Sequence, residues 1–149
     1  MSTEEFVTIT IIEKLKKNGW IILCYDFPQS GTGFSLKQNN SSSKNLNIVI
    51  PDVVAEKNGV GVLFENKDRF FLADFNKIEK LRTTDEYSNS LKLLFGGDIP
   101  VIMGYGIAFP QVKGQIEKAK LHFRKIDFLV TVSPQRELVD YYNPKNIAF

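Results

Sequence analysis

Three charged residues near the middle of the chain have the types and the spacing that a catalytic site needs. Asp52 is followed thirteen residues later by Glu65, and Lys67 lies two positions further on. The Lys57-Asn58-Gly59 segment between them is typical of a tight turn between two strands. Side chains two residues apart leave the same face of a strand, and a turn near residue 58 or 59 places Asp52 opposite Glu65. We therefore expect two carboxylates and one ammonium group to converge at one end of a β-hairpin.

Such a group of charges is suited to hydrolysis assisted by a divalent cation. Two adjacent carboxylates repel each other, so one of them would ordinarily take up a proton. A divalent cation removes this cost, and Mg²⁺ binds through one or two carboxylates together with water and substrate phosphates. The ammonium group of Lys67 is then available to orient the attacking water or to stabilise charge that develops at phosphorus. The pattern favours Mg²⁺ as the cofactor, with Mn²⁺ as its substitute.

With the residues beside them, these charges form the sequence Pro51-Asp52 followed by Glu65-Asn66-Lys67. This pattern resembles the PD-(D/E)XK nuclease superfamily, which includes type II restriction endonucleases and Holliday-junction resolvases. The resemblance covers residues 4–107. It implies an α/β fold with a restriction-endonuclease-like core, in which helices flank a central mixed sheet. The expected order of elements is a helix, three antiparallel strands, a helix and a further strand.

The resemblance also assigns roles to the residues of the motif. It implies that Asp52 and Glu65 are magnesium ligands, that the backbone carbonyl of Asn66 is a further ligand, and that Lys67 assists the attacking water. Asn66 departs from the pattern, because the middle residue of the motif is usually apolar. Many members carry a glutamate on the first helix, for which Glu5 is the nearest candidate.

The choice of the first-helix glutamate stays open in the sequence. Glu4 and Glu13 are rivals of Glu5, and Thr8 stands one turn closer to the strand, where a glutamate is expected. A group of basic residues follows the motif, and on a helix face such residues either contact DNA phosphates or are simply solvated. Glu79 among them favours the solvated face. The candidates for nucleic-acid binding are Arg69, Lys77 and Lys80, with Arg82 beyond them.

The function implied by the resemblance is that of a metal-dependent DNA endonuclease. Hydrolysis of the phosphodiester bond would leave a 5′-phosphate and a 3′-hydroxyl. We expect a restriction-type enzyme that acts as a homodimer or as the small cleavage subunit of a larger recognition partner, because the core leaves few residues for a recognition domain. A structure-specific nuclease resembling Holliday-junction resolvases is the nearest alternative. A non-catalytic binding or assembly module with the same fold is the other, favoured by Asn66 and the near-neutral charge.

Hydrophobic periodicity and breaking residues predict the elements that must position these side chains. The second helical region is expected to break near residue 84, with Thr84 or Asp85 as the N-cap of a further helix. Residues 38–45 are polar and predict a surface loop. The predicted helices span 4–17, 74–94 with that break, 112–123 and a short segment from Pro134, and the predicted strands span 20–25, 46–54, 60–66, part of 99–109, and 127–132.

Composition limits the other functions open to the chain. Its 149 residues, 43% hydrophobic and 24% charged, predict a single globular domain over residues 1–149. With one cysteine, Cys24, and one histidine, His122, an internal disulfide and zinc sites built from cysteines or several histidines are excluded. The net charge of +2 permits binding to DNA without requiring it.

The sequence also carries expectations about location and cofactors. No apolar stretch approaches the length of a membrane span, and Glu4 and Glu5 stand where a secretory signal would carry basic residues. We therefore expect a cytoplasmic protein with no membrane partner, which also fits its unpaired cysteine. The chain contains neither a P-loop nor a dinucleotide-binding fingerprint, so we expect no nucleotide cofactor.

Overall fold

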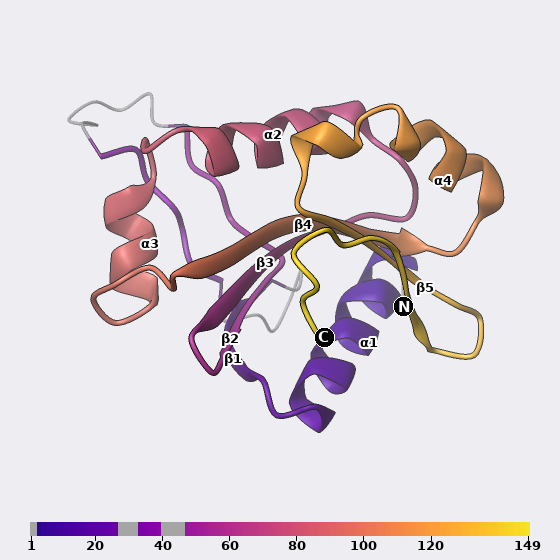
Figure 1. Ribbon diagram of the computed structural model, residues 1–149, viewed down its shortest axis with the longest axis horizontal. Helices are drawn as coiled ribbons and strands as arrows, with labels where there is room; N and C mark the ends of the chain where they lie inside the picture. Colours follow the sequence, from indigo (N-terminus) through magenta and orange to yellow (C-terminus); the bar gives the residue numbers. More distant parts are fainter. Residues whose placement is uncertain (1–2, 27–32, 40–46) are drawn as a thin grey trace.

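A mixed β-sheet forms the centre of the molecule, and helices cover both of its faces (Figure 1). The computed structural model describes residues 3–26, 33–39 and 47–149. The strands are β1 (Ile21–Tyr25), β2 (Val53–Lys57), β3 (Val60–Asn66), β4 (Ile102–Pro110), β5 (Phe128–Val132) and β6 (Leu138–Tyr142). The helices are α1 (Thr3–Lys17), α2 (Leu72–Thr83), α3 (Ser88–Leu94) and α4 (Lys113–Lys120), with a 3-10 turn η1 (Phe123–Lys125). The α/β class and the mixed sheet flanked by helices are thereby confirmed.

The six strands follow one another across the sheet in the order of the chain, from β1 to β6. The strands β1, β2 and β3 are antiparallel neighbours, and β5 and β6 pair antiparallel as well. Parallel pairs join β3 to β4 and β4 to β5, across crossovers that contain α2 and α3 in the first case and α4 in the second. Parallel strands need such long connections, whereas a two-residue turn suffices for β2 and β3.

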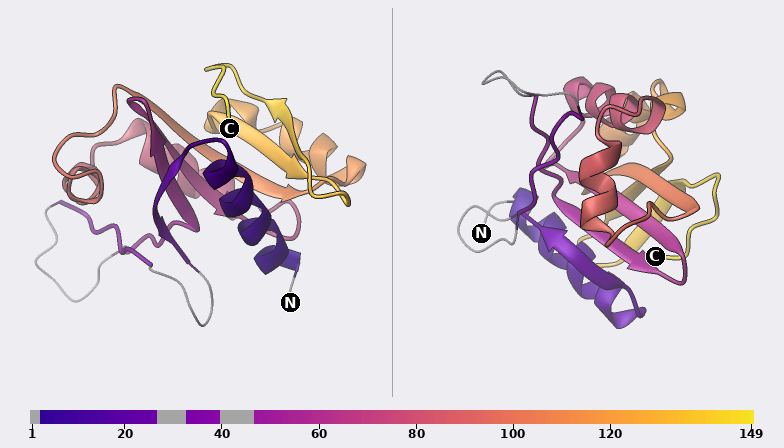
Figure 2. Two further views of the ribbon diagram at one scale, coloured as in Figure 1. Left: turned by 90° about the horizontal axis from the view of Figure 1, so that it is seen from below. Right: turned by 90° about the vertical axis from the view of Figure 1, so that its left-hand side faces the viewer.

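Two apolar clusters hold the layers together, one on each face of the sheet. On one face, Leu63 of β3 packs in a cluster with Phe75 and Ile78 of α2, and with residues of α3 and α4. On the other face, Phe64 packs with Val7 and other residues of α1. Figures 1 and 2 show α1 on the side of the sheet opposite to α2 and α4. Because helices cover both faces of the sheet, β3 lies in the interior of the molecule. Side chains at its end are therefore buried, except where they extend past the covering helices.

The turn between β2 and β3 sets the register that brings the candidate residues together. Asn58 and Gly59 have φ angles of 49° and 79°, as a type I′ turn requires. Lys57 therefore pairs with Val60, and the register runs on to the pair Val53 and Phe64. One further step places Asp52 opposite Glu65, which confirms the geometry expected from the spacing.

The second strand begins later than the sequence predicts. Residues 46–54 were the expected strand, whereas β2 spans Val53–Lys57 and Asp52 lies just before it. Val49 forms only an isolated bridge with Leu36, and Pro51 separates that bridge from the ladder because proline has no N–H to donate. Asp52 still reaches the ladder, since its N–H donates to the carbonyl of Phe64 over 3.1 Å.

The helix expected from Pro134 is wrong, because this part of the chain is a hairpin. Ser133 and Glu137 join through a backbone bond of 2.9 Å, Arg136 has a φ of 64°, and Leu138–Tyr142 follows as β6. Proline also begins turns, and the branched and aromatic side chains of this segment suit a strand that pairs with β5.

The expected N-cap at Thr84 or Asp85 is also wrong. Thr84 ends α2, where its hydroxyl donates to the carbonyl of Lys80 over 2.7 Å. The next helix begins only at Ser88, after Tyr87, without a side-chain cap. Two helices separated near residue 84 are nonetheless present, as expected.

The remaining predictions hold with shifted ends or lie outside the described residues. The first helix, the first and third strands, and the elements expected over 99–132 are all present. Most of the predicted 38–45 loop, residues 40–45, lies outside the described part. Among the described residues, no helix is long and apolar enough to cross a membrane.

Candidate active site

Asp52 is held at the mouth of the hairpin by the backbone of the opposite strand. Its Oδ2 accepts a hydrogen bond from the N–H of Asn66 over 2.7 Å. Its own N–H is bound to Phe64, so backbone and side chain are both fixed against β3. The carboxylate therefore has a defined position beside the last residues of β3.

Glu65 leaves β3 on the face covered by α2. Along this strand Leu63 points to the cluster with α2 and Phe64 points to α1, so alternation sends Glu65 to the side of Leu63. The same alternation along β2 sends Asp52 to that face, because Val54 packs in the cluster with α2. Glu65 is only 3% exposed, and the charge of Asp52 contributes to raising its pKa. The structure thus brings both predicted carboxylates to one place.

Burial makes the charged form of both carboxyl groups unfavourable. For Asp52, desolvation raises the pKa to about 7, against the opposing effect of the Asn66 N–H. For Glu65, desolvation and then the charge of Asp52 raise the pKa to about 8, although Lys77 lowers it. At neutral pH the pair therefore shares protons that two exposed carboxylates would have lost. Buried carboxyl groups with raised pKa values are common at functional sites.

Lys67, the third predicted residue, follows directly after β3 and lies close to the same charges. Partial burial lowers its pKa, but the carboxylates of Asp74, Glu4, Glu65 and Asp52, in that order, outweigh burial and raise it. Its ammonium group also lies 5.6 Å from the centre of the Phe71 ring. Lys67 is therefore a cation throughout the neutral range, placed beside the carboxylate pair.

The helix α2 adds two charged residues to the site. Lys77 was expected to contact DNA, but its Nζ lies 3.4 Å from Glu65 Oε2 and 4.0 Å from Asp74 Oδ1. Asp74 was not predicted. Its carboxyl group is buried, and burial raises its pKa against the opposing charges of Lys67 and Lys77. The sequence did hold a signal, since Asp74 interrupts the apolar face formed by Phe75, Ile78 and Leu81.

Three buried side-chain oxygens of this cluster accept no hydrogen bond within the described part of the chain. They are Glu65 Oε1, Asn66 Oδ1 and Asp74 Oδ2. Buried acceptors are normally paired, because an unpaired one loses the free energy of its hydration. A proton or a cation at the carboxylates would remove this penalty for Glu65 Oε1 and Asp74 Oδ2.

The donor set suits a small, hard cation that keeps several of its waters. Among the described residues, no three side chains of Asp, Glu, His or Cys lie together as a metal-binding group. The protein donors would therefore be the carboxylates of Asp52 and Glu65 and a backbone carbonyl. Mg²⁺ is commonly bound in this way, through one or two carboxylates and water, whereas Ca²⁺ takes more protein oxygens.

The first helix reaches the site at two positions. Asn66 is fully buried on the α1 side of the sheet, where its Nδ2 donates to Thr8 Oγ1 over 3.0 Å. Thr8, which stands where a glutamate was expected, thus fixes the middle residue of the motif. One turn earlier, the charge of Glu4 raises the pKa of both Asp52 and Lys67. Of the three glutamates left open by the sequence, Glu4 is the one that this electrostatic coupling favours.

The other basic candidates lie on the surface beyond the site. Arg69 is largely exposed and lies 5.3 Å from the centre of the Phe71 ring. Lys80 pairs with Glu86 over 3.2 Å, also in contact with water. Both side chains are exposed, and neither is part of the carboxylate cluster.

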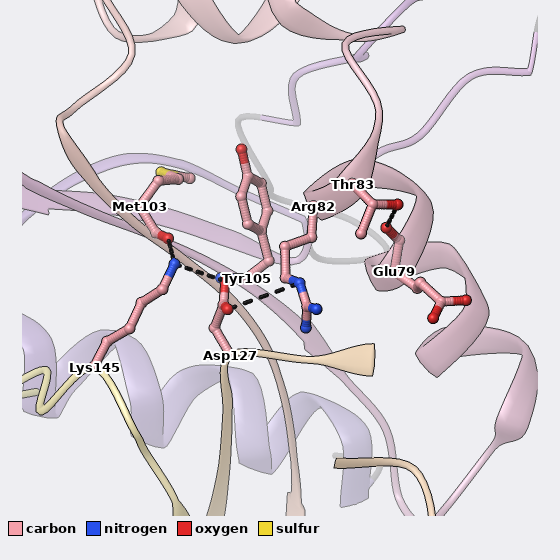
Figure 3. Close-up of polar contacts among 7 residues, drawn as sticks. All are labelled: Glu79, Arg82, Thr83, Met103, Tyr105, Asp127 and Lys145. Atoms are coloured by element: carbon pink, nitrogen blue, oxygen red, sulfur yellow. Dashed lines mark hydrogen bonds and ion pairs between the residues drawn. The ribbon is translucent and has the colours of Figure 1, made fainter. Parts of the chain in front are cut away.

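A further buried carboxylate, Asp127, has partners for both of its oxygens (Figure 3). Its Oδ2 accepts a hydrogen bond from the N–H of Tyr105 over 3.0 Å and lies 3.3 Å from Lys145 Nζ. Its Oδ1 lies 3.9 Å from Arg82 Nε, which leaves Arg82 with a structural contact. Asp127 therefore joins β4, α2 and the C-terminal segment, whereas the carboxylates around Glu65 retain unpaired oxygens.

Known proteins provide no further guide to this site. Comparison finds no family model that matches the chain and no significant match to a curated protein or to a solved structure.

Proposed function

We propose that the protein is a magnesium-dependent DNA endonuclease with a restriction-endonuclease-like core. The observation that carries the proposal is the pair of buried carboxyl groups, Asp52 and Glu65, on one face at the end of a hairpin with Lys67 beside them. Support for the core comes from three antiparallel strands after α1, followed by α2 and by β4, which is parallel to β3. This is the order of elements that the resemblance to PD-(D/E)XK nucleases implies.

The metal would be held by Asp52, Glu65 and the carbonyl of Asn66. Asn66 suits this role because its N–H points to Asp52, and the carbonyl of a strand residue points to the same side as its N–H. The unpaired Oε1 of Glu65 supplies a free acceptor. A bound Mg²⁺ would lower the pKa of water and offset negative charge on the substrate phosphate.

Lys67, Asn66 and Thr8 would then each have a separate role in the reaction. Lys67 keeps its proton in the neutral range, so it can donate hydrogen bonds to the attacking water and to a phosphate oxygen. The bond from Asn66 N–H fixes the direction of the Asp52 carboxylate. Thr8 fixes Asn66 in turn, and both contacts hold the donor groups in place before substrate binds.

The substrate class follows from this chemistry and from the resemblance. Hydrolysis of a phosphodiester bond in DNA would leave a 5′-phosphate and a 3′-hydroxyl. We favour a restriction-type enzyme, which acts as a homodimer or together with a larger recognition subunit. Arg69 and Lys80 remain candidates for phosphate contacts, because they lie on the exposed surface near the site.

The first experiment is cleavage of supercoiled plasmid with Mg²⁺, with Mn²⁺ and with EDTA. We expect nicking or linearisation that depends on the metal and falls by about 100-fold or more in Asp52→Asn, Glu65→Gln and Lys67→Met. Asp68→Asn is the matched control, because Asp68 is an exposed carboxylate next to the motif that pairs with Arg69. We expect this variant to cleave like the wild type.

A four-way DNA junction, tested in parallel, separates a restriction-type enzyme from a junction-specific one. Discrete plasmid fragments favour sequence-specific cleavage, and cleavage of the junction alone favours the structure-specific alternative. If no substrate is cleaved and calorimetry detects no binding of Mn²⁺, the endonuclease proposal is wrong. The fold would then be assigned to a non-catalytic binding module.

A further inference from the structure

We propose that Lys77 is a resident counter-ion of the carboxylate site, which a divalent cation must displace from Glu65 before it can bind. Lys77 would then set the affinity of the protein for its metal. The inference rests on the proposed function to the extent that it assigns a divalent cation to Asp52 and Glu65. It concerns a residue outside the motif, and its test is a binding measurement.

The geometry places one ammonium group between two buried carboxylates. Lys77 Nζ lies 3.4 Å from Glu65 Oε2, within hydrogen-bonding distance, and 4.0 Å from Asp74 Oδ1. The side chains of the two acids are 4% and 8% exposed, whereas that of Lys77 is 39% exposed. The lysine thus approaches from the solvent side of α2 and covers Glu65, and it is the cation that partly compensates the burial of Glu65.

A divalent cation and this ammonium group would compete for the same carboxylate. Mg²⁺ binds carboxylate oxygens at about 2.0–2.1 Å, so it would lie only a few ångströms from Lys77 Nζ. Two cations at such a distance in a site with little water repel each other strongly. Lys77 can relieve this repulsion, because its side chain is flexible and more than a third of it is already in contact with water.

Asp74 provides the place to which the displaced ammonium group can move. It lies three residues before Lys77 on the same helix, and its Oδ2 accepts no hydrogen bond among the described residues. A small rotation of the lysine side chain exchanges Glu65 for Asp74 as its main partner. After this movement Glu65 would be free to hold the metal, and Asp74 would be the main partner of Lys77.

The test is a calorimetric titration of metal-free protein with Mn²⁺ at pH 8.5. We expect Lys77→Met to bind Mn²⁺ about tenfold more tightly than the wild type, because the competing charge is gone. Lys77→Arg keeps the charge and is expected to bind no more tightly than the wild type. Lys80→Met is the matched control, since Lys80 lies one turn away on α2 and pairs with Glu86 outside the site. Its affinity should equal that of the wild type.

The outcomes separate this inference from the proposed function. If wild type and Lys77→Met bind Mn²⁺ equally, or the variant binds more weakly, Lys77 is no competitor, although the metal site stands. Binding by the variant alone supports the inference and shows that Lys77 blocks the wild-type site. If neither binds, the inference about Lys77 is wrong, and plasmid cleavage decides separately whether the endonuclease proposal stands. Should Lys77→Met not fold, Lys77→Gln replaces it, because a glutamine keeps a hydrogen-bond donor near Glu65 without the charge.

Discussion

Asp52 and Glu65 retain protons at a pH at which ordinary carboxyl groups have lost them. Desolvation is the main cause for both, and it raises their pKa values to about 7 and about 8. In the metal-free protein the ionised pair is therefore unfavourable. Burial of the pair therefore lowers the stability of the metal-free fold, a cost that binding of the proposed cation would offset.

The unfavourable ionisation of the buried Glu65 carboxyl group predicts how the stability of a variant depends on pH. A carboxyl group whose pKa is higher in the folded than in the unfolded chain contributes stability at low pH, and loses it as the pH rises through the folded pKa. For Glu65 the loss runs from the ordinary value of about 4.3 up to its folded value of about 8. Glu65→Gln does not ionise, so we expect its stability relative to the wild type to rise by up to about 4 kcal/mol between pH 5 and pH 9.

Urea unfolding of metal-free protein at the two pH values checks this expectation. Glu117→Gln serves as the control, because Glu117 is an exposed carboxylate that pairs with Lys120. Its stability relative to the wild type should change little with pH. A gain from Glu65→Gln that is the same at both pH values would contradict the assignment of a raised pKa.

The same protons must leave when a cation binds. At pH 7 the Asp52 and Glu65 carboxyl groups still hold protons, so binding of Mn²⁺ should release about one proton per ion. The number should fall towards zero at pH 9.5, where both groups are already ionised. Calorimetry in two buffers with different ionisation enthalpies measures this release, and a release that does not vary with pH would place the metal elsewhere.

At the scale of elements, one buried hydrogen bond joins α1 to the end of β3, beyond the apolar packing of α1 on that strand. The Nδ2 group of Asn66 donates to the hydroxyl of Thr8 between β3 and α1, and both residues are buried. This bond connects the first helix with the residue that lies between Glu65 and Lys67. The position of α1 therefore affects the motif directly.

Replacing Thr8 by valine removes the acceptor and leaves a buried Asn66 donor unpaired. We expect Thr8→Val to lower the free energy of unfolding by about 2 kcal/mol and to reduce DNA cleavage as well. Thr10→Val is the matched control, because the Thr10 hydroxyl only donates to the Phe6 carbonyl within the same helix. Chemical unfolding checks both variants, and equal losses would show that the bond to Asn66 has no special role.

The elements that follow local rules could be predicted, and so could the pair of carboxylates that they carry. Asn58-Gly59 specifies a two-residue turn, and the strand period then places Asp52 opposite Glu65. Asp74 and Lys77 could not be joined to this pair, since their distance from Glu65 depends on how α2 packs on the sheet. Thr8 was identified only as the residue at a position where a glutamate was expected. The segment after Pro134 was mistaken for a helix because proline begins turns as well as helices, whereas this segment turns back and pairs with β5, the strand just before it.

At the scale of the whole molecule, Asp127 joins parts of the chain that the sheet alone does not hold. It binds the N–H of Tyr105, Arg82 of α2 and Lys145 near the C-terminal end (Figure 3). Lys145 also donates to the carbonyl of Met103 over 2.8 Å. The Asp127 carboxylate is buried and paired, so its main effect is on stability.

Loss of this carboxylate should weaken the fold and leave the metal site intact. We expect Asp127→Ala to lower the free energy of unfolding by about 3 kcal/mol, because it leaves the Tyr105 N–H without a partner. Asp127→Asn keeps an acceptor for that N–H and should cost about 1 kcal/mol, since Arg82 and Lys145 are partly hydrated. Denaturant unfolding and a Mn²⁺ titration check both variants, and a changed Mn²⁺ affinity would contradict the separation of the two clusters.

The order of the strands in space repeats their order in the chain, from β1 to β6. Each new strand therefore adds at an open edge, beside the strand that was made just before it, and none has to be inserted between two that are already paired. During synthesis the sheet can grow in one direction as the chain emerges. All the residues assigned to the site lie between Glu4 and Lys80, so its parts are available for assembly before the second half of the sheet has been made.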